Sequence, residues 1–144
     1  MGHDVSIAIE WGTPTKYASS LAALEAAGWE IRDMTGSSFI REDATDSGDW
    51  LMFQPVAVES VRDLVATRDE SRQFAGVVLM YRNTLHGCSF LWIDRNTLVV
   101  SPSINRVELT GGWVDASWYM SRLCQPLLAG GCAIESVSLN ETLT

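Results

Sequence analysis

Apolar residues near the N-terminus first alternate with polar ones and then change to a helical spacing. They occupy every second position of residues 5–11, which predicts a half-buried strand. Spacings of three and four over residues 17–24 then predict a helix. We expect Thr13 to cap this helix, with Pro14 at its first position and Gly28 just beyond its end.

The next part of the chain predicts three short strands and a second helix. The alternation at residues 29–34 and the apolar runs at residues 38–41 and 50–54 indicate the strands. A stripe of Val and Leu residues predicts a helix over residues 58–66. We interpret the charged run at residues 67–72 as solvated.

The most β-rich region follows this charged run. Residues 74–82 are apolar enough for a central strand, and residues 88–94 predict its partner across a turn. Residues 97–100 and 104–109 continue the pattern, and Pro102 is expected to force a bend or bulge between them. The arrangement is typical of an antiparallel meander.

The C-terminal part predicts a last helix and a last strand. The helix covers residues 113–129, with Asp115 as cap or first-turn anion, and Pro126 is expected to bend or end it. Residues 133–139 then predict a strand. The order β-α-β-β-β-α-β-β-β-α-β predicts one α+β domain over residues 1–144, a mainly antiparallel sheet with about three helices packed on it.

Charge and composition narrow the possible partners. The chain of 144 residues carries 18 carboxylates against 10 cations, and 47% of its residues are hydrophobic, which excludes a disordered chain. The net charge of −8 repels phosphate backbones, so we expect no nucleic acid as partner and favour a basic protein instead. No apolar run is long enough for a membrane span and no secretory signal is visible. We therefore expect a cytoplasmic protein without a membrane partner.

No pattern of reactive side chains indicates a catalytic, cofactor or metal site. The three cysteines have neither CxxC spacing nor an even number, which favours reduced thiols over disulfides or zinc ligands. His86 and Cys88 flank Gly87, and this arrangement fits a turn better than a nucleophile with its base. The sequence thus leaves enzymatic activity open while favouring none, and it predicts no cofactor.

Acidic and aromatic residues are the best candidates for a binding surface. A turn-rich loop carries four carboxylates, and such clustering is costly unless a partner uses it. Tryptophan supplies large, rigid contact area at binding hot spots. Trp11, Trp29 and Trp92 fall at apolar strand positions and are expected in the core. The predicted partner-binding residues are Glu42, Asp43, Asp46, Asp49, Trp50 and Trp113.

The C-terminal sequence carries a resemblance to a known class of proteins. Residues 104–109 precede the run Trp113-Val114-Asp115-Ala116-Ser117-Trp118-Tyr119, and Leu123, Leu127-Leu128 and residues 134–137 follow it. This succession resembles the end of small bacterial immunity proteins that neutralise polymorphic toxins, in which a D-x-x-W-Y helix follows a meander and precedes a last strand. The resemblance implies a bacterial, non-enzymatic protein whose partner is a toxin domain, as in toxin–antitoxin systems, and it implies no particular contact residues.

Two other functions remain open from the sequence. The chain could be a small-molecule-binding or enzymatic domain with a pocket between the sheet and the last helix, lined by Trp118, Tyr119 and Cys124. It could also be a structural protein whose exposed edge strands pair into a homodimer. The sequence thus allows either a monomer or a homodimer.

Overall fold

The computed structural model describes residues 3–33, 38–41, 50–53 and 57–143. Over this part of the chain the helices and strands follow the predicted order. The elements are β1 (His3–Trp11), α1 (Tyr17–Ala26), β2 (Trp29–Ile31), β3 (Ser38–Arg41), β4 (Trp50–Phe53), α2 (Val58–Glu70), β5 (Ala75–Tyr81), β6 (Gly87–Asp94), β7 (Thr97–Ile104), α3 (Ala116–Ala129) and β8 (Ile134–Leu143).

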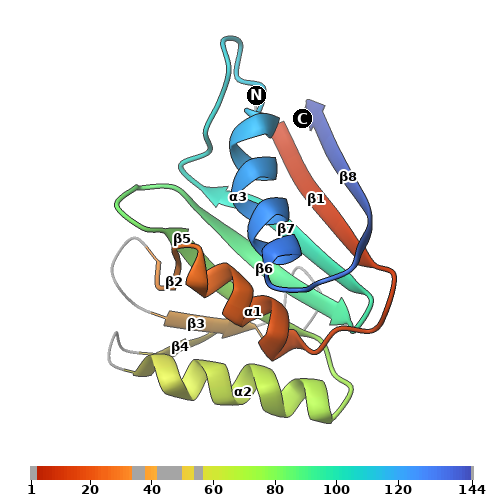
Figure 1. The fold of residues 1–144 in the computed structure, drawn as a ribbon. Coiled ribbons are helices and arrows are strands. Elements are labelled where there is room, and N and C mark those ends of the chain that lie inside the picture. The colour runs from red at the N-terminus through yellow and green to blue at the C-terminus, as the bar shows by residue number, and fades with distance from the viewer. Residues whose placement is uncertain (1–2, 34–37, 42–49, 54–56, 144) are drawn as a thin grey trace.

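The strands of the described residues form a single antiparallel sheet of eight strands. Their order is β4-β3-β5-β6-β7-β1-β8, and β2 pairs with β5 off this path. The N-terminal strand β1 therefore lies between β7 and the last strand β8 (Figure 1). Helices α1, α2 and α3 pack on the sheet, so the predicted α+β fold with a mainly antiparallel sheet is confirmed.

One hydrophobic core lies between the sheet and the three helices. Alternate residues of the central strands, such as Ile7, Phe90 and Val100, point into it and are completely buried. This alternation is the period-two pattern that predicted the strands. The expectation that Trp11, Trp29 and Trp92 belong to the core is confirmed, because each is at most 2% exposed. Among the described residues no helix is long and apolar enough to cross a membrane.

The predicted start of α1 is wrong, because a distant carboxylate supplies the cap. The helix begins at Tyr17, and its N-cap residue Lys16 makes no capping bond. The Tyr17 N–H instead donates to Oδ2 of Asp69 at 2.8 Å. A negative charge at a helix N-terminus is favourable, so α2 caps α1 in place of Thr13.

The expectation that residues 67–72 are solvated is wrong at Asp69, although most of the run is exposed. Helix α2 continues to Glu70, and Asp69 is only 3% exposed. Asp69 follows Val61 and Val65 at intervals of four residues, so it lies on the buried stripe of the helix. Its second oxygen accepts a hydrogen bond from Arg95 Nε at 2.7 Å, which compensates the buried charge.

The strand segments expected on either side of Pro102 join in one strand that ends at Ile104. Strand β7 runs through the proline to Ile104 and pairs with β6 over this length. Its pairing with β1 ends at Val100, so the missing N–H of Pro102 lies beyond the ladder with β1. Residues 105–109 leave the sheet, and the expected strand over 104–109 does not form.

Helix α3 continues through Pro126 because a side chain replaces the lost backbone hydrogen bond. The helix starts at Ala116, after the predicted cap Asp115, and it ends at Ala129 rather than at the proline. Pro126 has no N–H for the Arg122 carbonyl, four residues earlier. The indole Nε1–H of Trp29 donates to that carbonyl at 2.8 Å, so the carbonyl remains satisfied.

Candidate functional site

The segment between β7 and α3 folds back on itself as a narrow hairpin, which we call the apical loop (residues 105–115). The Leu109 N–H donates to the Trp113 carbonyl at 2.7 Å, and the Asp115 N–H donates to the Val107 carbonyl at 2.8 Å. The loop projects past the sheet at the end where β1 begins and β8 ends (Figure 1).

Two glycines make the turn of the apical loop possible. Gly111 and Gly112 have φ angles of 93° and 87°, in the left-handed region that glycine adopts without steric cost. The Gly112 N–H closes the turn by donating to the Leu109 carbonyl at 3.2 Å. The Gly-Gly break before the last helix is therefore the tip of a hairpin.

Side chains from α3 and β8 fix the base of this loop. The buried hydroxyl of Tyr119 accepts a hydrogen bond from the Val107 N–H at 2.9 Å. Both carboxylate oxygens of Glu141 lie 3.0 Å from the Val114 nitrogen, whose N–H they accept. Asp115 caps α3 by accepting from the Trp118 N–H at 3.3 Å, which confirms the capping role expected for it. The loop is thus held from both sides.

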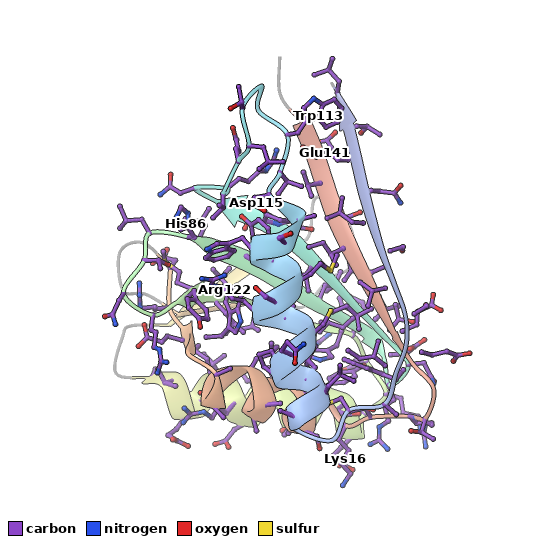
Figure 2. The ribbon with its side chains drawn as sticks, turned by 45° about the horizontal axis from the view of Figure 1, so that its top comes forward. Lys16, His86, Trp113, Asp115, Arg122 and Glu141 are labelled. Atoms are coloured by element: carbon purple, nitrogen blue, oxygen red, sulfur yellow. The ribbon has the colours of Figure 1, made fainter. Side chains whose placement is uncertain are left out.

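Apolar and acidic side chains lie on the apical loop and beside it. Leu109 is 56% and Trp113 is 46% exposed, although both are large apolar residues. Leu143, at the end of β8, is 55% exposed and lies two positions beyond Glu141. Figure 2 shows Trp113 and Glu141 at this end of the molecule, above Asp115. We call Glu108, Leu109, Trp113, Asp115, Glu141 and Leu143 the apical patch.

The sequence around the apical patch is acidic. From the start of the apical loop, residues 105–144 contain four carboxylates and two cations, Arg106 and Arg122. Arg122 lies on α3, one turn beyond Trp118, and its guanidinium stacks on that indole at 4.3 Å from the ring centroid. The patch therefore presents a negative field around exposed apolar surface, a combination that suits a partner with basic and apolar groups.

Of the other predicted partner-binding residues, the backbone of Trp50 lies within the described part of the chain. Glu42, Asp43, Asp46 and Asp49 lie outside the described residues. Trp50 begins β4 at one edge of the sheet, and its side chain lies outside the described part. Trp113 is the predicted partner-binding residue whose exposure the structure gives, and its role in binding stays a prediction.

The three residues of the alternative pocket belong to packed surroundings. Tyr119 is fully buried, and Cys124 is half-buried with its sulfur 3.9 Å from that of Met120. Trp118 packs edge-on against Tyr119, with ring centroids 4.9 Å apart. Surface cavities of about 380 and 450 Å³ are lined by other residues. The small-molecule function stays an alternative, and Trp118, Tyr119 and Cys124 do not line either of these cavities.

Arg122 is a residue that the sequence analysis did not single out. Its guanidinium also lies 5.2 Å from the ring centroid of Tyr81. Its Nε atom is buried and has no hydrogen-bond partner among the described residues. The His86 ring packs edge-on against the same Trp118, 5.3 Å away, and Figure 2 shows His86 and Arg122 on one side of α3. These contacts fix the first turns of the helix that carries the loop.

The His86 and Cys88 pair lacks the geometry of an activated nucleophile. The Cys88 thiol is completely buried, and burial raises its pKa, which disfavours the reactive thiolate. His86 Nδ1 instead bonds to the Asn105 carbonyl, at the start of the apical loop. Among the described residues no group of three His, Cys, Asp or Glu side chains is placed to hold a metal ion.

The cavity of about 380 Å³ adjoins the Asp69 and Arg95 ion pair. Tyr17 lines it too, and burial together with the Asp69 charge raises the pKa of its hydroxyl. That hydroxyl already donates to the Gln73 carbonyl at 2.8 Å. The two Asp69 oxygens accept from the Tyr17 backbone N–H and from Arg95. These contacts hold α1 against α2, so the cluster has a structural role that needs no ligand.

Comparison with protein-family models, with curated proteins and with solved structures finds no match for this chain.

Proposed function

We propose that this protein is a non-enzymatic binding protein whose apical patch contacts a basic protein partner. The observation that carries the proposal is a large indole, 46% exposed, at the tip of a loop fixed at its base by hydrogen bonds. Holding a contact residue in place before binding lowers the entropy lost on association. Exposed tryptophan on a rigid support is typical of binding hot spots.

The partner that we propose is a toxin domain. The stretch of residues 104–137 that resembles bacterial immunity proteins contains the apical loop and the helix that follows it. An acidic surface suits this role, because complementary charge speeds encounter with a basic target. The acidic loop at residues 42–49 is a second predicted contact, and replacing its four carboxylates by amides should slow association and flatten its dependence on salt.

Affinity capture from lysate of the source organism tests this function. The tagged chain is used at low salt beside two single variants, Trp113→Ala and Leu128→Ala. Leu128 is the matched control, because it is 52% exposed on α3 but lies outside the patch. We expect one basic protein at stoichiometric yield, released as salt rises, with at least about tenfold less bound to Trp113→Ala. Equal capture by both variants would contradict the role of the patch, and an acidic captured protein would contradict the proposed partner.

A further inference from the structure

Strand β8 forms one long edge of the sheet. It pairs with β1 from Leu143 back to Ile134, and no described strand lies on its other side (Figure 1). Its ten residues include no proline and no lysine, two residues that commonly block an edge. The register shifts once, beside Glu10, so the rest of the edge is regular.

Backbone groups on alternate residues of β8 point toward this open side. The Gly12 N–H donates to the Ala133 carbonyl, and the Trp11 N–H donates to the Asn96 carbonyl next to β7. Even-numbered amides of β1 therefore face β8, opposite even-numbered residues of β8. The alternation of an antiparallel ladder then directs the amides of residues 137, 139 and 141 to the open side.

The charges along this edge select the strand that can pair with it. Strands β1 and β8 carry four carboxylates and neither lysine nor arginine. These carboxylates lie near both ends of the edge: Asp4, Glu10, Glu135 and Glu141. Residues 123–144 contain no lysine or arginine at all. An added strand with basic side chains would find opposite charge at each end.

A second copy of this chain is a poorer occupant of the same edge. In one register that pairs nearly the whole strand, antiparallel self-pairing centred on Ser138 places Glu135 of each copy opposite Glu141 of the other. Like charges directly opposite each other destabilise a strand pair. Each copy also carries a net charge of −8, which opposes association.

We propose that β8 is an acceptor strand to which an extended, Lys- or Arg-rich segment of a partner protein adds as a further strand. Main-chain hydrogen bonds supply the affinity in this mode of recognition, and the flanking carboxylates supply the selectivity. The inference rests on the proposed function only in requiring a basic partner. Because β8 ends beside the apical loop, where Glu141 contacts Val114, one partner can contact the edge and the patch together.

A peptide probe tests this edge without knowledge of the natural partner. The probe is a capped ten-residue peptide in which lysine alternates with threonine and valine, and its control has glutamate in place of lysine. Amide exchange is followed by NMR in the full chain. We expect the lysine peptide to slow exchange at residues 137, 139 and 141 by about tenfold when its concentration is ten times its Kd. The even-numbered amides, already bonded to β1, should change little, and the glutamate peptide should not bind.

Two charge variants distinguish the effect of charge at the β8 edge from the effect of the protein's overall charge. Glu135→Lys places a cation on the exposed start of the edge, and Asp63→Lys makes the same change on the exposed face of α2. We expect Glu135→Lys to weaken the peptide severalfold more than Asp63→Lys does. Equal weakening, or protection outside β8, would overturn the proposal. A dimer of the free chain in sedimentation, with the odd-numbered β8 amides already protected, would overturn it as well.

This test and the capture experiment fail separately. Trp113 lies on the apical loop and not on β8, so Trp113→Ala should leave peptide binding at the edge unchanged. Slowed exchange at β8 together with unchanged capture by Trp113→Ala would overturn the function of the patch and support the edge. Capture that depends on Trp113 with no protection of β8 by the lysine peptide would overturn the edge alone.

Discussion

Replacing Tyr119 by phenylalanine should loosen the apical loop while leaving the core packed. Tyr119→Phe keeps the completely buried ring and removes only the hydroxyl that accepts from the Val107 N–H at 2.9 Å. A lost hydrogen bond with an unsatisfied partner costs about 1–3 kcal/mol. Val107 is half-buried, so water can reach part of the freed donor, and we expect a loss near 1 kcal/mol. For a chain of this size that loss lowers Tm by roughly 3–4 °C.

The matched control removes a hydroxyl at another place in the fold. Tyr17 is equally buried, and its hydroxyl donates to the Gln73 carbonyl at 2.8 Å. Tyr17→Phe should cost a similar amount in denaturant unfolding. Only Tyr119→Phe should also speed amide exchange at Val107 and Asp115, because the hydroxyl ties the base of the loop to α3.

Three results would refute this reasoning. The first is unchanged exchange at Val107 and Asp115 in Tyr119→Phe, and the second is equal acceleration there in Tyr17→Phe. The third concerns the proposed function. If rigidity of the loop lowers the entropy lost on binding, Tyr119→Phe must weaken binding of the partner protein, although the buried hydroxyl that it removes cannot contact that protein. If the variant with a loosened loop bound the partner with full affinity, binding would not depend on preorganisation of the loop.

Three further predictions concern protonation, thiol reactivity and helix packing. Burial raises the pKa of Tyr119 from its usual 10 to about 12, so the folded state keeps the phenol neutral where the unfolded chain has ionised it. Stability should therefore fall as pH rises from about 10 toward about 12, and denaturant titrations should show that Tyr119→Phe reduces this fall. The buried Cys88 thiol should react with an aromatic disulfide reagent only as fast as the chain unfolds, and rapid labelling of the native protein at this residue would contradict its burial. A Cβ on Gly130 would lie 2.5 Å from the Cβ of Ala23, so Gly130→Ala should cost about 1–3 kcal/mol in thermal unfolding. Gly12→Ala is the control, because its nearest neighbour would lie at an ordinary 3.6 Å, and we expect a change below about 0.5 kcal/mol.

The order of elements and the core tryptophans could be predicted because hydrophobic periodicity reports burial directly. Strand β1 alternates over residues 5–11, and the odd-numbered residues of this stretch point into the core, as the period of two requires. The predictions were wrong where a contact with a residue distant in sequence overrode the local pattern. Thr13 and Pro14 are a good local start for a helix, yet Asp69, more than fifty residues away, caps Tyr17 instead.

Of two misread residues, Asp69 and Pro126, only the first carried a usable signal. Asp69 continues the four-residue spacing of Val61 and Val65, so its position on an apolar stripe indicated a buried carboxylate that needs a cationic partner. Pro126 carried no such signal, because its effect depends on the Trp29 indole reaching the Arg122 carbonyl across the core. Local propensity cannot report a contact made by the tertiary fold.

In the candidate site, too, some residues could be predicted from the sequence and others could not. Trp113 could be predicted because a tryptophan beside a Gly-Gly break has no apolar pattern around it to bury it. Leu109 and Glu141 could not, since their roles depend on the hairpin closing and on β8 lying next to it. The sequence Leu109-Thr110-Gly111-Gly112-Trp113, two apolar residues flanking a tight turn, is the one local pattern that indicates an exposed tip.

Charge and rigidity at the apex are carried by the same side chains. Glu141 and Asp115 contribute negative field, but each also accepts a backbone hydrogen bond that holds the apical loop or its helix. Glu108 is exposed, and its backbone rather than its carboxylate contributes to the hairpin. Neutralising Glu141 would therefore change the electrostatic attraction of a partner and the order of the loop together. A change confined to the Glu108 carboxylate alters the field and leaves the loop in place, so the salt dependence of its effect measures the electrostatic contribution alone.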